Sequence, residues 1–259
     1  MRLDRALALD LGRALRSRPI QLYLALQLGA AAVFVARRGQ DTVSTVLLIW
    51  LGLAVVAFLA WWAGRHRLAH PEPDLVPAAG ARTVFALLVV GGWVMWGFGL
   101  SAEAGFLLLF VGVGGWVWST VRAGGLMGLR ARLLRDPRPF VPLLIFIGLP
   151  RLLAIGPLYL LGVGVALPSG IVQQLLLLLG LFAPLEAWSQ RPGWAALAAA
   201  AIFALLHVPT VMEPNHGDLI AAYANVVLFQ LSVGLIAILA FRRHRAAVPI
   251  GVAHALTIA

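Results

Sequence analysis

The chain has 259 residues, of which 61% are hydrophobic and 12% are charged. Soluble domains are about half apolar and about a quarter charged, so this composition excludes an ordinary soluble domain. The apolar residues lie in long runs, which excludes a disordered chain, a coiled coil and a β-barrel porin. We therefore expect an all-α fold, an integral membrane bundle of about eight or nine transmembrane helices.

The basic residues are 20 Arg and no Lys, against 10 acidic residues, which gives a formal net charge of +10. Because the Arg residues cluster between the apolar runs, they indicate membrane topology rather than nucleic-acid binding. The chain contains no Cys, which excludes disulfides, thiolate nucleophiles and thiolate metal sites.

The first 18 residues contain five Arg and two Asp, and Leu3, Leu7, Leu11 and Leu15 recur at every fourth position. This spacing places the four Leu side chains on one face of a helix, with most of the Arg residues off that face. Residues 1–18 are therefore predicted to form a basic amphipathic helix on the cytoplasmic leaflet.

Apolar segments fill most of the remaining chain. We place nine of them, at 19–36, 43–63, 83–101, 105–121, 140–167, 171–190, 194–208, 218–241 and 246–259. The fifth contains Pro150 and Gly156, so it forms either one kinked span or a re-entrant hairpin. We expect residues 19–167 to form the N-terminal transmembrane helices and residues 168–259 to form a core that holds a polar pocket.

The distribution of Arg predicts the orientation in the membrane. With nine spans and a cytoplasmic N-terminus, 17 Arg residues fall on the inner side, whereas only Arg37 and Arg38 fall on the outer side and Arg151 lies inside a span. An excess of Arg on the cytoplasmic side is the usual signature of orientation. We therefore expect an integral protein of a bacterial-type plasma membrane with its N-terminus in the cytoplasm.

Polar side chains inside a membrane span are costly unless they are paired, so each one is a candidate for function. These candidates are Arg151, Gln173, Gln174, Glu186, His207, Asn225, Gln230 and His254. Gln173 and Gln174 fall near the outer end of the sixth segment, and His207 falls near the outer end of the seventh. His254 lies about 12 Å above the inner start of the last segment. We expect Gln173, Gln174, His207 and His254 to converge on one buried polar pocket.

Other interpretations of these residues remain open. Glu186 falls at the inner end of the same hairpin, about 20 Å from His207, where it belongs to the site or forms a helix-end charge pair with Arg191. His207 could simply end a helix, and Gln173 and Gln174 could be interhelical hydrogen-bonding residues. Two His residues with no carboxylate nearby make a poor zinc site, so we expect no metal and no cofactor.

Two short motifs near the C-terminus carry a resemblance. At Phe203-x-x-x-His207 and at Val252-Ala-His254-Ala-Leu256, the chain resembles the CPBP family, the CAAX prenyl proteases and bacteriocin-processing enzymes. The segment Phe229-Gln-Leu-Ser-Val-Gly234 and the basic turn Arg242-Arg-His-Arg245 are similar to the family's penultimate helix and the turn after it. The resemblance covers residues 168–259, about a third of the chain.

The resemblance implies an intramembrane endopeptidase that hydrolyses peptide bonds in peptides or small membrane proteins. In this family a Glu-Glu pair followed by an Arg forms the first motif, and a Glu together with the His of Phe-x-x-x-His activates a water. The final His and an Asn four residues later stabilise the oxyanion. By this resemblance, His207 is the base or water ligand and His254 is the oxyanion donor.

The first motif of the family has two possible placements in this chain. In one, Glu186 and Arg191 keep the family's spacing, but Glu186 lies at the far end of the hairpin from His207. In the other, which we favour, Gln173 and Gln174 take the two Glu positions at the correct depth. A Gln side chain cannot accept a proton, so it orients a water but does not deprotonate it.

Two functions therefore remain open. The first is an active CPBP-like endopeptidase in which His207 alone serves as the base. The second is a member without hydrolytic activity whose pocket binds a peptide, a lipid or a partner protein, as in bacteriocin immunity or a scaffold. The second gains weight because the Asn position after His254 is Ile258, which cannot donate to an oxyanion. The expected partners are membrane lipids and a peptide or small membrane protein, and not nucleic acid.

Overall fold

The computed structural model describes residues 15–63, 79–97, 138–244 and 247–258, together with scattered positions between 100 and 119. Regular structure in these residues is helical, and no strand occurs among them, which confirms the predicted all-α fold. Nearly all of the predicted amphipathic helix at 1–18 lies outside the described residues.

The first two predicted segments form helices close to their expected bounds. Helix α2 spans Arg18–Arg38, and helix α3 spans Val43–Ala63. Gly39 ends α2 with a φ of 95°, a left-handed conformation that favours glycine, and the short helix η1 (Gln40–Thr42) leads into α3. Helix α4 (Ala79–Gly97) follows in the region predicted as the third segment.

The predicted boundary between the fifth and sixth segments is wrong. After η2 (Arg138–Phe140), helix α6 (Val141–Ile155) ends at Gly156, which has a φ of 78°, and helix α7 (Leu158–Leu175) starts two residues later. Pro168 lies inside α7 and does not end it. The boundary at 167/168 that we expected between two parts of the chain therefore falls inside a continuous helix.

The helical backbone continues without a break after Leu175, the last residue of α7. It passes into the π-helix η3 (Leu176–Phe182) and then into α8 (Ala183–Ser189). Residues 173 and 174 therefore lie in the middle of a long helix, and not near its outer end as predicted. The wide π-turns begin two residues after Gln174, and such turns are frequent at functional sites.

The C-terminal part contains α9 (Pro192–Leu205), α10 (Val208–Met212), α11 (Leu219–Leu228), α12 (Gln230–His244) and α13 (Val248–Ile258). The side chain of Asp218 caps α11 by accepting hydrogen bonds from the backbone N–H groups of Ile220 and Ala221. Helices α11 and α12 together form one apolar stretch that is long enough to span a membrane.

By length and composition, five helices among the described residues could cross a membrane. They are Arg18–Arg38, Gln40–Trp62, Arg138–Ile155, Leu158–Phe182 and Leu219–Arg242. The predicted seventh and ninth segments form shorter apolar helices, Pro192–Leu205 and Val248–Thr257. The predicted total of eight or nine spans is therefore not reached within the described part of the chain.

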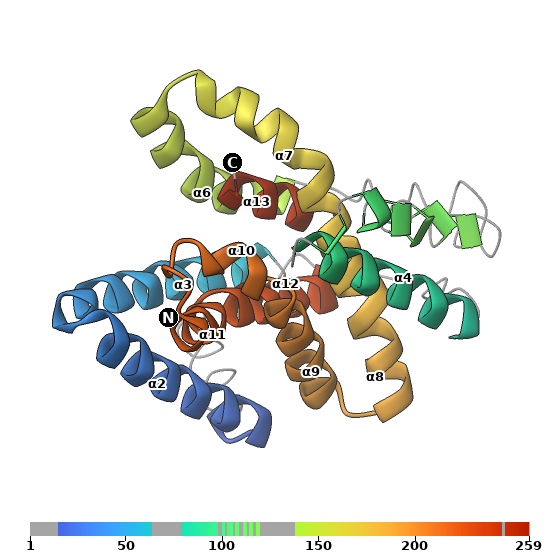
Figure 1. Cartoon of the computed structure of the whole chain (residues 1–259), viewed down its shortest axis with the longest axis horizontal. Coiled ribbons are helices and arrows are strands. Elements are labelled where there is room, and N and C mark those ends of the chain that lie inside the picture. The colour runs from blue at the N-terminus through green and yellow to red at the C-terminus, as the bar shows by residue number, and fades with distance from the viewer. Residues whose placement is uncertain are drawn as a thin grey trace.

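Helices α11 and α12 lie at the centre of the fold. Helix α2 packs on α11, and both α3 and α9 pack on α12, whereas α13 lies against α7 and α6 on the other side (Figure 1). The contact of α13 with α7 is close, because a Cβ on Gly251 would lie 2.7 Å from the Cα atom of Ile171. This packing brings α13, the middle of α7 and the end of α9 together, where the polar residues meet.

Candidate functional site

Three helices supply the polar residues of the candidate site. Gln173 lies on α7, His207 immediately follows the last turns of α9, and His254 lies in the middle of α13. All three side chains are buried. Apolar core residues such as Phe203, Ala204 and Ala253 surround these three polar side chains in the chain.

Gln173 contacts both imidazoles. Its Oε1 atom lies 2.8 Å from Nε2 of His254 and 3.2 Å from Nε2 of His207. The two imidazole rings are 6.2 Å apart between centroids and almost perpendicular, at 86°. Three of the four residues predicted to converge therefore form one buried cluster, the Gln173–His207–His254 cluster.

Two further residues belong to this cluster: Phe203, which the sequence indicated only as part of the Phe203-x-x-x-His207 motif, and Ser169, which was not predicted. The ring of Phe203 packs 4.5 Å from that of His207 and 5.8 Å from that of His254, between centroids. The hydroxyl of Ser169 lies 3.0 Å from Nε2 of Gln173. Ser169 stands four residues before Gln173 and so shares its helix face. We expected the chain between 167 and 171 to separate two segments, which concealed this relation.

The partners of His207 determine its protonation. Its Nδ1 atom lies 2.7 Å from the carbonyl oxygen of Phe203, and its Nε2 atom faces Oε1 of Gln173. Both partners are acceptors, so this arrangement requires an N–H group on each ring nitrogen and makes His207 an imidazolium cation. A cation is costly in an apolar interior.

A half-turn of the Gln173 amide removes the need for a cation. The half-turn exchanges Oε1 and Nε2, which have nearly the same size. The amide nitrogen then donates to Nε2 of both imidazoles, and Oε1 accepts from the hydroxyl of Ser169. His207 is neutral in this arrangement, and its Nδ1–H donates to Phe203. Because the Nε2 lone pairs of both rings are then occupied, neither ring is available to take a proton from water.

Gln174 does not join the cluster. Its side chain is fully buried, and neither atom of its amide has a hydrogen-bond partner among the described residues. Gln174 lies instead on the wall of a separate cavity, where it is accompanied by His254. The single pocket that we predicted for four residues is therefore two adjoining sites, with His254 between them.

The cavity lies between α3, α6, α12 and α13 and has a volume of about 450 Å³. Its walls are mostly apolar side chains, such as Leu53, Phe146 and Ile236. Its polar residues are Thr45, Arg151, Gln174, His254 and Thr257. The Nδ1 atom of His254 also has no hydrogen-bond partner among the described residues, so two unsatisfied polar groups belong to the wall of one cavity.

Glu186 lies away from both sites. It forms an ion pair with Arg242 on α12, at 3.0 Å, rather than the predicted pair with Arg191. Glu186 follows Gln173 by 13 residues on one continuous helix, which is about 20 Å of helix length. The placement of the first motif at Gln173 is thus the one whose side chain contacts both His residues.

The described residues contain no group of three or more His, Cys, Asp or Glu side chains that could hold a metal ion. The two imidazoles have an amide beside them where a metal site would need a third anionic or imidazole ligand. The cluster can therefore donate and accept hydrogen bonds, but its described residues do not form a metal centre.

The fold and the site define an all-helical protein with helices apolar enough to span a membrane and a polar cluster buried among them. Comparisons of the chain with protein-family models, with curated proteins and with solved structures find no match.

Proposed function

We propose that this protein is a CPBP-like membrane protein that binds a ligand inside the membrane and does not hydrolyse it. The observation that supports this proposal is the position of Gln173, whose amide lies between the two imidazoles. By the family resemblance, a carboxylate would stand at this position and act on a water.

An amide at this position removes the base. Hydrolysis of a peptide bond needs a group that takes a proton from the attacking water. The Gln173 amide cannot do so, and in the neutral arrangement of the cluster its N–H groups occupy the Nε2 lone pairs of His207 and His254. The same contacts join α7, His207 and α13 beside the cavity, so the cluster serves as a structural wall and not as a base.

The cavity beside the cluster favours binding. Gln174 and His254 belong to its wall and carry buried polar atoms without partners among the described residues, and such a group costs about 1–3 kcal/mol. A rotation of these side chains toward the cavity would let a ligand hydrogen-bond to them and recover that cost. Volumes of roughly 300–1,000 Å³ are usual for small-ligand sites, and this cavity, at about 450 Å³, falls within that range.

A second candidate function is an intramembrane endopeptidase. It is favoured by the convergence of His207 and His254 on one residue of α7, which is the relation that the family resemblance implies. In this case His207 would act as the base after the Gln173 amide rotates away from it. The two functions differ in whether the unmodified protein cleaves a peptide.

The test is an incubation of purified protein with a panel of membrane peptides. We expect no cleavage by the wild type and none by His207→Ala. We expect slow cleavage by Gln173→Glu, because this change supplies the missing carboxylate at the same position. The matched control is Gln27→Glu, which places a carboxylate at a buried Gln that contacts Val227 and Trp50, outside the cluster.

Cleavage by the wild type that disappears in His207→Ala would contradict the binding function and establish the endopeptidase. Cleavage by the wild type that survives both His207→Ala and His254→Ala would place hydrolysis elsewhere in the protein and contradict both candidates. Equal cleavage by Gln173→Glu and Gln27→Glu would remove the support that the cluster gives to the family resemblance.

We also propose that the N-terminus is cytoplasmic in a bacterial-type plasma membrane, as the Arg distribution indicates. The absence of Cys makes this easy to test with single Cys substitutions and a membrane-impermeant maleimide. In intact cells, Arg38→Cys should react and Arg191→Cys should not. The reverse pattern would overturn the orientation.

A further inference from the structure

The cavity between α3, α6, α12 and α13 is elongated along α3. Its residues on α3 run along one helix face from Thr45 to Ala60, a distance of about 20 Å. Its residues on α12 run from Val233 to Ala240, and Phe229 lies just before this helix. Leu48 and Phe146 on its wall are also exposed, so the cavity opens sideways onto the apolar surface of the protein.

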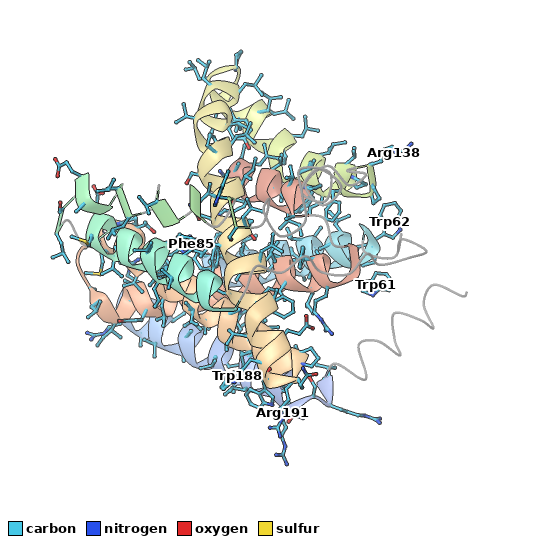
Figure 2. The ribbon with its side chains drawn as sticks, turned by 90° about the vertical axis from the view of Figure 1, so that its right-hand side faces the viewer. Trp61, Trp62, Phe85, Arg138, Trp188 and Arg191 are labelled. Carbon is cyan, nitrogen blue, oxygen red and sulfur yellow. The ribbon has the colours of Figure 1, made fainter. Side chains whose placement is uncertain are left out.

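The two ends of this cavity differ in polarity. Helix α6 runs in the opposite direction to α3, since η2 at its start contacts α3 and Arg138 lies on the same side of the molecule as Trp61 and Trp62 (Figure 2). Leu143 therefore lies toward the Ala60 end of the cavity. Arg151, eight residues later and about 12 Å along α6, lies toward the other end.

Arg151 is the charged residue of the cavity wall, and no Asp or Glu occurs among the described residues that line the cavity. Thr257 belongs to the same end, because a Cβ on Gly148 would contact Leu256 and so places the end of α13 beside this part of α6. An elongated, mostly apolar cavity with one guanidinium toward one end matches an amphiphile with one apolar chain and one negative charge.

We propose that this cavity binds a single-chain lipid with an anionic headgroup, a long-chain fatty carboxylate. Its carboxylate accepts hydrogen bonds from the guanidinium of Arg151, and its chain lies along α3 toward Ala60. Gln174 and His254 line the same cavity. A peptide fits these observations less well, because its repeated amide groups would need partners that the apolar walls lack.

This inference rests on the proposed function, since it names the ligand of a membrane-embedded binding protein. The proposed function and the proposed ligand are tested by different measurements. Peptide cleavage that depends on His207 overturns the binding function whatever the lipid result is. A lipid measurement that shows no selective binding overturns the identity of the ligand and leaves the cleavage result unaffected.

The experiment uses the full-length protein reconstituted in phosphatidylcholine vesicles with a spin-labelled stearic acid as the probe. The fraction of probe that is motionally restricted by the protein measures binding. We expect the wild type to bind the stearate about tenfold better than its neutral methyl ester, because one charge-assisted pair is lost in the ester. An excess of oleate should displace the bound stearate.

Two variants locate this binding in the cavity. Gly52→Phe should abolish the selective binding, because Gly52 lines the cavity and a Cβ there meets nothing within 4 Å, so the ring enters the space that the lipid chain needs. Arg151→Gln should reduce stearate binding to the level of the ester. The controls are Gly29→Phe, on α2 with equally open space, and Arg191→Gln, at an exposed Arg.

Selective stearate binding that is equal in Gly52→Phe and Gly29→Phe would overturn the proposal, because the probe would then bind outside the cavity. Equal binding of stearate and its methyl ester by the wild type would also overturn it. So would a loss of binding in Arg191→Gln as large as that in Arg151→Gln, because general attraction to the basic surface would then explain the result.

Discussion

Gly170 on α7 lies directly against Ala255 on α13: a Cβ on Gly170 would lie 2.7 Å from the backbone nitrogen of Ala255 and 2.8 Å from its Cβ. The residue next to Ala255 is His254, and the residue three positions after Gly170 is Gln173. The close approach of the two helices therefore fixes the distance across which Gln173 and His254 form their hydrogen bond.

This relation predicts that Gly170→Ala displaces α13 and weakens the cluster. Backbone atoms cannot yield as a flexible side chain does, so we expect a loss of about 1–3 kcal/mol in stability, seen as a lower midpoint of thermal unfolding in detergent. The control is Gly164→Ala on the same helix, where a Cβ would meet nothing within 4 Å. Equal midpoints for the two variants would show that the close approach does not hold α13 in place.

The sequence predicted α2 and α3 well because uninterrupted apolar runs bounded by polar residues leave little choice of helix ends. It failed between α6 and α8. Pro150, Gly156 and Pro168 all signal a break, yet only Gly156, with its positive φ, ends a helix. Which of these residues breaks a helix depends on the neighbouring helices, and a single sequence does not contain that information.

The sequence predicted only part of the site, again because it does not show which helices are neighbours. Gln173 and His207 were brought together by their order along antiparallel helices. Adjacent residues on a helix point about 100° apart, so Gln173 faces the cluster whereas Gln174 lies on the wall of the cavity. The cavity at Arg151 was not predicted, because its four walls come from helices that are distant in the sequence.

The ion pair of Glu186 with Arg242 predicts a structural role for Glu186. The two side chains are 23% and 37% exposed, and partly exposed pairs contribute about 0–1 kcal/mol. Glu186→Gln should therefore lower stability slightly and leave ligand binding and any peptide cleavage unchanged. A double-mutant cycle with Arg242→Gln measures the coupling. Loss of binding or cleavage in Glu186→Gln, with stability retained, would return Glu186 to the functional site.

Gln173→Glu should create a zinc site. The new carboxylate would lie beside Nε2 of His207 and Nε2 of His254, which together give the His, His and carboxylate ligands typical of catalytic zinc. We expect about one zinc per chain after reconstitution and dialysis, measured by elemental analysis, and none in the wild type. Adding His254→Ala to the variant should remove the metal, and zinc retained in that double variant would contradict the assigned geometry.

Asp218, which lies outside the apolar helices, should make the stability of the protein depend on pH. The backbone N–H of Ala221 donates to its carboxylate and, together with nearby Arg37, keeps the pKa of Asp218 below its usual value. The stabilisation is therefore complete above the ordinary pKa of an Asp and is lost as the pH falls through the lowered value. The thermal midpoint of the wild type should fall in acid more steeply than that of Asp218→Asn. Parallel curves for the two proteins would show that the charge of this residue does not stabilise α11.

Gln174 should show a conflict between stability and binding. Both atoms of its amide are buried without a partner among the described residues, and such a group costs about 1–3 kcal/mol. Gln174→Leu has a similar volume and removes this cost, so it should raise the thermal midpoint of the ligand-free protein. The same change should weaken binding in the cavity, because the ligand loses a hydrogen-bonding group. The informative comparison is with Gln173→Leu, which breaks contacts to His207 and His254 and should lower stability. A lower thermal midpoint for Gln174→Leu would mean that the amide is already hydrogen-bonded in the ligand-free protein, which would contradict this prediction.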